Sequence, residues 1–136
     1  MSRQQAGPAF PGRDCEHKAK VARMADQMVP VFRVKNATAS AEFYQRIGFI
    51  LEGTHQFEPS FPIYAFLRRG DVQLHLSEHK GDAPKKSLAY FWVNDIDSIA
   101  ESLGIEVEQA PWARELEVVD PDGNTIRCGQ PDSGTA

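Results

Sequence analysis

Residues 115–130, ELEVVDPDGNTIRCGQ, predict a β-hairpin. Apolar residues lead into the turn and resume after it, while Pro121 presets φ and Gly123 supplies the positive φ that a short hairpin needs. Arg127 stands between two apolar residues of the second arm, so strand alternation places its guanidinium on the face opposite the core. That face meets either bulk solvent or a binding cavity, and the rest of the chain indicates which.

The composition of the 136-residue chain, with 41% hydrophobic and 25% charged residues, is that of one globular domain. A formal net charge of −4 and no basic stripe argue against nucleic-acid binding. No apolar run approaches the roughly 20 residues needed to span a bilayer, and the N-terminus lacks the apolar core of a signal peptide. Two cysteines do not indicate a disulfide framework. We therefore expect a cytoplasmic protein with no membrane partner.

The order of predicted elements is a strand, a helix and three strands, and after a polar segment at residues 79–87 the same order begins again. Asn36 or Thr38 is expected to cap the first helix, and Gly48 and Gly104 are placed to end the two helices. The repeated order indicates an internal repeat. The predicted strands are 29–34, 49–54, 62–69, 71–77, 88–93, 105–108 and the two hairpin arms.

The chain is expected to divide into one domain with two short extensions. The first residues are polar and punctuated by Gly and Pro, a composition that buries little apolar surface, although residues 18–28 have the apolar spacing of a short helix. The predicted divisions are 1–28 for a flexible or partly helical extension, 29–130 for the domain, with modules of about 29–78 and 88–130, and 131–136 for a C-terminal tail.

Strand alternation divides the predicted sheets into a face that packs on the helices and a face that lines a cavity. The cavity face combines aromatic residues with a few polar groups, which is typical of a small-molecule pocket. The helix-facing residues are Phe32, Val34, Ala65, Leu67, Val72, Leu74, Leu76, Ala89, Phe91, Val93, Ile126 and Cys128. The cavity-facing residues are Tyr64, Phe66, Gln73, His75, Tyr90, Trp92, Thr125 and Arg127.

The candidate binding residues each have a purely structural alternative. Tyr90 and Trp92 either stack on a ligand or fill a closed cup or a dimer interface. His75 is expected to be a hydrogen-bonded wall residue, because no Asp, Cys or Ser stands at a spacing that suggests a triad. Arg127 either receives an anionic ligand group or pairs with a glutamate, Glu115 or Glu117, across the hairpin.

Loop aromatics extend the candidate site beyond the strands, because binding residues gather on loops held by a rigid scaffold. Trp112 is a candidate lid over the cavity, or else it covers a hydrophobic edge. Phe57 and Phe61 stand in the loop HQFEPSFP, whose two prolines indicate an ordered rim.

Three segments resemble a known family: VFRV with AEFYQRIGF (31–34 and 41–49), FLRRGDVQLHL (66–76) and VVDPDGNTIR (118–127). Together they resemble the vicinal-oxygen-chelate superfamily, which groups glyoxalase I, extradiol dioxygenases, fosfomycin-modifying enzymes and bleomycin resistance proteins. The resemblance implies an α+β fold of two tandem βαβββ modules, whose curved mixed sheets form a cup with the helices outside.

The metalloenzymes of that superfamily place their ligands at four cup-facing positions, where this chain has Val29, His75, Leu88 and Arg127. Only His75 can bind a metal, because a guanidinium is not a ligand donor and a divalent ion wants three or more N or O groups. The resemblance is therefore closest to the bleomycin-resistance branch, whose members have no metal and sequester a drug in a crevice between two identical subunits.

We therefore expect a homodimeric antibiotic-resistance protein with no metal or cofactor that binds a cationic, aromatic, drug-like molecule without turnover. One alternative is a metal-dependent lyase, dioxygenase or transferase of the same fold. Another is an interaction module whose cup is filled by its own side chains. The expected ligand-binding residues are Phe57, Phe61, Tyr64, Phe66, His75, Tyr90, Trp92, Trp112 and Arg127.

Overall fold

The computed structural model describes residues 25–132. Most of the predicted N-terminal extension, including most of its expected helix, lies outside these residues. No helix in the described part is long and apolar enough to cross a membrane. The elements in chain order are β1 (Val31–Arg33), α2 (Ala37–Gln45), β2 (Ile50–His55), β3 (Tyr64–Arg69), β4 (Val72–Ser77), β5 (Leu88–Trp92), α3 (Ile96–Leu103), β6 (Glu108–Gln109), β7 (Ala113–Val119) and β8 (Thr125–Pro131).

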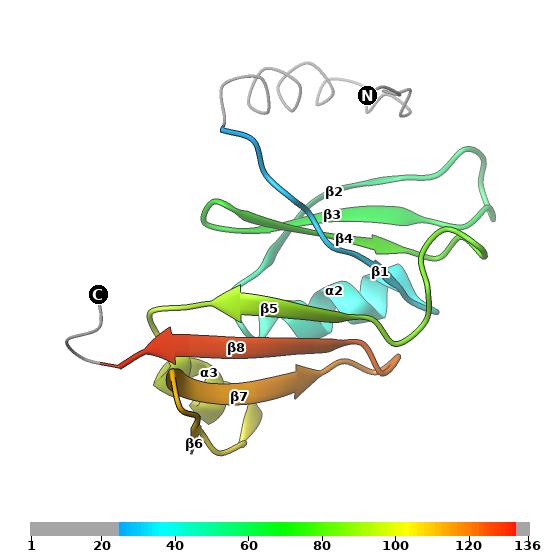
Figure 1. Ribbon diagram of the computed structural model, residues 1–136. Helices are drawn as coiled ribbons and strands as arrows, with labels where there is room; N and C mark the ends of the chain where they lie inside the picture. Colours follow the sequence, from blue (N-terminus) through cyan, green and yellow to red (C-terminus); the bar gives the residue numbers. More distant parts are fainter. Residues whose placement is uncertain (1–24, 133–136) are drawn as a thin grey trace.

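The strands form two four-stranded sheets with the orders β1-β4-β3-β2 and β5-β8-β7-β6. In each sheet the first strand of the module pairs in parallel with the last, and the other neighbours are antiparallel. Figure 1 shows the two sheets one above the other, with α2 and α3 behind the strands. Because both halves have the same topology, the predicted α+β fold of two βαβββ modules is confirmed.

The start of α2 and the end of α3 lie where the sequence indicates, whereas α2 ends at Gln45, with Arg46 and not Gly48 at its C-cap. The side chain of Asn36 accepts a hydrogen bond from the backbone N–H of Ala39 at 3.0 Å and so caps α2. The apolar stripe of α2, from Ala37 through Ala41 and Tyr44, is buried against the sheets. At the end of α3, Gly104 adopts the left-handed conformation with φ of 67°, a conformation that glycine adopts without steric cost.

The turn of the β7–β8 hairpin docks on the first module. Asp120 accepts a hydrogen bond from Tyr44 Oη at 2.8 Å, and Asp122 accepts one from the backbone N–H of Lys35 at 3.0 Å. Asn124, which is fully buried, donates to the last carbonyl of β1 at 2.9 Å. Burial, and then the Asp120 carboxylate, raise the pKa of Tyr44 far above its ordinary value, so the phenol remains a donor. The hairpin thus joins the two modules.

Three details of the sequence prediction are wrong, each because pairing or packing depends on a distant segment. β1 begins at Val31 and pairs with β4 over three residues, so Val29 precedes the strand. β6 lies at Glu108–Gln109, later than expected, because only these residues meet β7. Val72 was assigned to the helix-packed core but is 39% exposed, because it borders a cavity between the modules.

Candidate functional site

The first group of predicted site residues, the β3–β4 cluster, consists of Tyr64, Phe66 and His75. The ring centroids of Phe66 and His75 are 4.8 Å apart, and those of Tyr64 and Phe66 are 5.3 Å apart. A hydrogen bond of 2.9 Å joins Tyr64 Oη and His75 Nδ1. Burial, and then the Asp82 carboxylate, raise the pKa of Tyr64 to about 12. The phenol therefore stays protonated at neutral pH and fixes the orientation of the imidazole.

The second group, the β5–β7 cluster, consists of Tyr90 and Trp92 on β5, Trp112 before β7, and Glu115 on β7. Tyr90 Oη donates to Glu115 Oε2 at 2.6 Å, and Trp112 Nε1 donates to the same oxygen at 2.8 Å. The ring centroids of Tyr90 and Trp92 are 4.9 Å apart. The three aromatic residues are 39%, 56% and 59% exposed in chain order, so the cluster presents aromatic surface around a carboxylate.

Arg127 pairs with a glutamate on the neighbouring strand and not with Glu115. Its Nε and Nη2 donate to Glu117 Oε2 at 3.1 and 3.0 Å, and the two residues stand directly opposite each other in the β7–β8 ladder. The structure thus favours the cross-hairpin pair over the free anion receptor. Such an exposed pair contributes at most about 1 kcal/mol to stability.

The loop between β2 and β3 carries the remaining predicted aromatics, Phe57 and Phe61, which are both exposed. The ring of Phe57 packs edge-on against His55, with centroids 4.7 Å apart, and against His79 at 6.3 Å. Burial, and then the charge of His79, lower the pKa of His55. The loop is therefore held by ring contacts at its Phe57 end.

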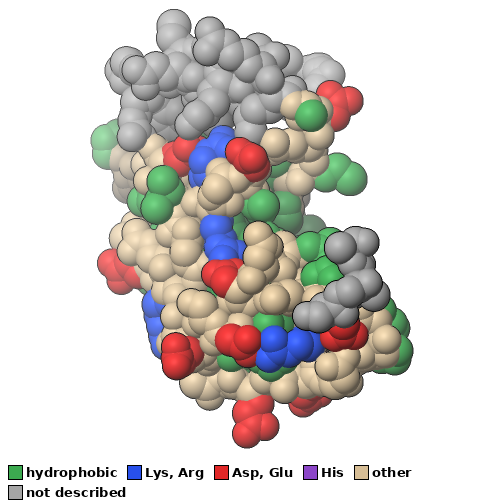
Figure 2. All heavy atoms as spheres, turned by 90° about the vertical axis from the view of Figure 1, so that its left-hand side faces the viewer, with side chains coloured by type: hydrophobic (Ala, Val, Ile, Leu, Met, Phe, Trp, Pro, Cys, Tyr) green, Lys and Arg blue, Asp and Glu red, His purple; other side chains and the backbone are tan. Residues whose placement is uncertain are grey.

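A cavity of about 680 Å³ opens between the two modules. Its walls are residues 27–30, the start of β4 at 71–74, and β5 at 89–92, with Phe49 and Ile126. Figure 2 shows hydrophobic side chains in the hollow between the two halves of the molecule. Of the predicted site residues, only Tyr90 and Trp92 border this cavity.

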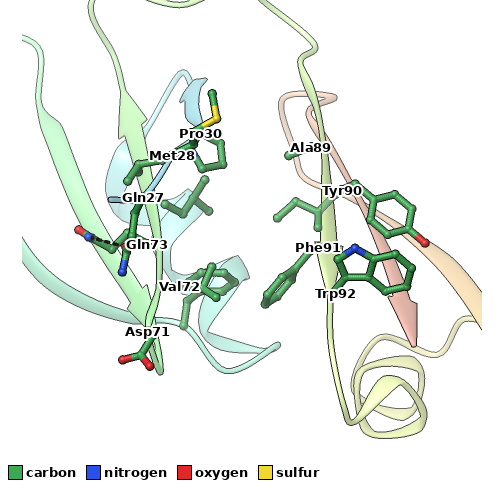
Figure 3. Close-up of a pocket in the computed structure, with 14 residues that line it drawn as sticks. Gln27, Met28, Pro30, Asp71, Val72, Gln73, Ala89, Tyr90, Phe91 and Trp92 are labelled. Atoms are coloured by element: carbon green, nitrogen blue, oxygen red, sulfur yellow. Dashed lines mark hydrogen bonds between the residues drawn. The ribbon is translucent and has the colours of Figure 1, made fainter. Parts of the chain in front are cut away.

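Tyr90 and Trp92 border this cavity but turn their rings away from it. In Figure 3, Val72 and Phe91 extend into the gap from β4 and β5, while Tyr90 and Trp92 lie on the far side of β5. Gln73 stands two positions before His75 on β4, so the two side chains share one face of the strand. In Figure 3 the side chain of Gln73 lies on the far side of β4 from the gap. In this view the faces that carry the two clusters point in opposite directions. The two clusters therefore lie on separate faces of one subunit.

Comparison with known proteins agrees with this two-module architecture. A family model described as "Glyoxalase superfamily protein" matches residues 13–134. The chain belongs to the glyoxalase superfamily. No protein of curated function matches the chain.

Solved structures of the glyoxalase fold include binders and resistance proteins. A bleomycin-binding protein complexed with bleomycin has 22% identity and a TM-score of 0.62, covering 79% of this chain and 100% of its own. The bleomycin-binding protein from bleomycin-producing Streptomyces verticillus, complexed with copper(II)-bleomycin, has 26% identity and a TM-score of 0.59, covering 80% and 100%. The fosfomycin resistance protein FosX from Listeria monocytogenes has 16% identity and a TM-score of 0.62, covering 81% and 96%.

The metal of the glyoxalase superfamily's metalloenzymes does not fit the residues that this chain places at the four ligand positions. Val29 and Leu88 have no donor atom, and Arg127 is a cation bonded to Glu117. Within residues 25–132 no three His, Cys, Asp or Glu side chains gather closely enough to hold an ion. His75 alone does not satisfy a divalent ion, which wants three or more such groups.

The site contains two residues that sequence reasoning missed. The sequence suggests Glu115 only as a partner for Arg127, yet in the structure it is the centre of the β5–β7 cluster. The sequence does indicate its orientation, because strand alternation places Glu115, Glu117 and Arg127 on one face of the hairpin. No local pattern marks Gly129, because its role depends on a side chain from another strand, Tyr90, which lies over it.

Proposed function

We propose that this protein is a small-molecule-binding protein of the bleomycin-resistance type, which sequesters a cationic aromatic ligand without turnover. The observation that carries the proposal is the β5–β7 cluster, in which Tyr90, Trp92 and Trp112 expose ring faces next to the Glu115 carboxylate. Aromatic faces stack on planar guests and attract cations. Similarity to two bleomycin-binding proteins supports this reading.

The ligand is proposed to lie between two copies of the chain. The β5–β7 cluster is an open wall on its own, whereas a pocket typically buries about 70–90% of the surface of its ligand. A two-fold dimer that sets the β3–β4 cluster of one subunit against the β5–β7 cluster of the other closes two equivalent sites. Phe57 and Phe61 then belong to the rim.

Binding without catalysis is supported by the protonation state of the residues that could act as nucleophiles. Tyr64 and Tyr90 both have raised pKa values, chiefly because of burial, and so remain phenols at neutral pH. Burial raises the pKa of the Cys128 thiol to about 11, and its side chain lies in the core. A protonated, buried thiol is not a nucleophile.

Titration with bleomycin, followed by tryptophan fluorescence and calorimetry, tests the proposal. We expect saturable quenching of Trp92 and Trp112, one ligand per subunit, a dimer by light scattering, and recovery of ligand of unchanged mass. A Trp92→Leu variant should weaken binding by about two- to tenfold, since loss of one stacked ring is worth about 0.5–1.5 kcal/mol. Glu101→Gln, an exposed change on α3, is the control. The absence of saturable quenching, or a change in ligand mass, would contradict the proposal.

A metal titration separates this function from a metal-dependent enzyme of the same superfamily. Addition of Ni²⁺, Zn²⁺, Mn²⁺ or Fe²⁺ should leave the melting temperature unchanged, because binding to the folded state alone would raise it. One equivalent of bound metal with a raised melting temperature would favour the enzyme.

A further inference from the structure

Both side chains that donate a hydrogen bond to Glu115 are neutral. Its Oε2 accepts from two neutral donors, Tyr90 Oη at 2.6 Å and Trp112 Nε1 at 2.8 Å. Arg127, which lies on the same face of the hairpin, is bonded to Glu117 instead. Glu108 stands directly opposite Glu115 in the β6–β7 ladder, and two like charges across a ladder repel each other. None of the bonds that Glu115 makes within residues 25–132 is to a cation.

The position of Tyr90 depends on the missing side chain of Gly129. Tyr90 starts on β5 and reaches across β8 to Glu115 on β7. A Cβ built at Gly129 would lie 2.8 Å from Tyr90 Cζ and would collide with its Oη. Gly129 has no positive φ, so its backbone does not require glycine. Glycine is required here because the Tyr90 side chain occupies the space that a Cβ would need.

We propose that Tyr90, Trp92, Trp112 and Glu115 form a subsite for an organic ammonium group, and that Gly129 controls whether this subsite exists. The inference rests on the proposed function and assigns the cationic end of the ligand to these side chains. Ring faces of tyrosine and tryptophan attract ammonium groups through their quadrupoles. The adjacent carboxylate then provides the single full charge that holds the group in place.

The geometry further favours an ammonium over a guanidinium. A guanidinium pairs best with a carboxylate through two parallel hydrogen bonds, one to each oxygen. Here Oε2 of Glu115 already accepts two bonds, while Oε1 makes none within residues 25–132. One remaining oxygen suits the compact charge of an ammonium, which needs no planar pair of acceptors.

The test uses the full-length chain and four probes of similar size: benzylammonium, benzyltrimethylammonium, benzylguanidinium and benzyl alcohol. Tryptophan fluorescence reports Kd for each. We expect both ammonium probes to bind saturably, the guanidinium at least threefold more weakly, and the alcohol without saturation. Equal binding of the neutral alcohol and the ammonium probes would overturn the proposal.

Two variants test the assigned residues. Glu115→Gln and Gly129→Ala should each weaken the ammonium probes by about tenfold, while Glu101→Gln should leave Kd within twofold. Circular dichroism melting checks that each variant is folded. A third variant, Tyr90→Phe with Trp112→Phe, keeps the rings but releases Oε2, so binding should shift toward the guanidinium probe. If Kd is unchanged in Gly129→Ala or Glu115→Gln, or if the double variant leaves the preference unchanged, the subsite is wrong.

The failure of this subsite and the failure of the proposed function give different results. If bleomycin binds wild type, Glu115→Gln and Gly129→Ala equally, the subsite is wrong and the function stands. If the ammonium probes bind as expected and bleomycin does not, the bleomycin-type function is wrong and the subsite stands.

Discussion

Replacing Tyr44 by Phe removes one hydroxyl from the junction between the two modules. That hydroxyl is fully buried and donates to Asp120 Oδ2 at 2.8 Å. The substitution leaves the ring and its edge-on contacts with Phe43 and Phe49 in place, so the loss is that of a hydrogen bond to a charged group. Such a bond contributes about 1.5–3 kcal/mol to stability, and we expect the free energy of unfolding to fall by that amount.

The remaining bonds to Asp120 set the upper limit of this effect. Its Oδ1 accepts from the backbone N–H groups of Asp122 and Asn124, both at 2.9 Å, and its Oδ2 also accepts from Asn124 Nδ2 at 3.1 Å. The carboxylate is therefore not left unpaired when Tyr44 loses its hydroxyl. A loss well above 3 kcal/mol would mean that the turn itself has opened.

Equilibrium denaturation in urea is the measurement, with Tyr64→Phe as the matched control. Tyr64 is partly buried and its hydroxyl bonds an imidazole nitrogen and not a carboxylate, so the bond is worth about 0.5–1.5 kcal/mol. The Tyr44 variant should therefore lose more stability than the Tyr64 variant, with the same m-value. Equal losses, or a loss below 0.5 kcal/mol for Tyr44→Phe, would refute the reasoning that Asp120 and Tyr44 join the modules.

Three further predictions concern pH, an ion pair and a thiol. Because burial raises the pKa of Tyr64 from 10.0 to about 12, the unfolded chain loses this proton first, so stability should fall between pH 10 and 12. Tyr64→Phe should make that part of a urea-midpoint profile less steep, while the raised pKa of Tyr44 keeps part of the slope; an unchanged slope would contradict this. Arg69→Met should cost about 1–2 kcal/mol, since Arg69 pairs with Asp95 and lies 5.2 Å from the Phe91 centroid; an unchanged urea midpoint would show that this link adds nothing. Cys128 should resist iodoacetamide at pH 8 in the native state, because its pKa is raised to about 11 by burial; rapid labelling, located by mass spectrometry, would contradict this.

Local pattern in the sequence was sufficient for most of the fold. The spacing of Ala37, Ala41 and Tyr44 predicts the buried side of α2, and Gly104 predicts where α3 ends. The alternation around Arg127 correctly separates its side from the core residues Ile126 and Cys128. These features depend on residues a few positions apart, where helix and strand periods determine the direction of each side chain. The repeated element order then predicts two modules.

Only the tertiary structure shows which of these correctly oriented side chains meet. The bond from Tyr44 to Asp120 spans 76 positions of the chain, and the ring of Tyr90 finds its space over Gly129 on another strand. Nor does alternation reveal that the two aromatic clusters lie on separate faces of one subunit. Strand period specifies the side on which a residue lies, whereas the neighbour across the sheet and the packing of one module on the other depend on long-range contacts.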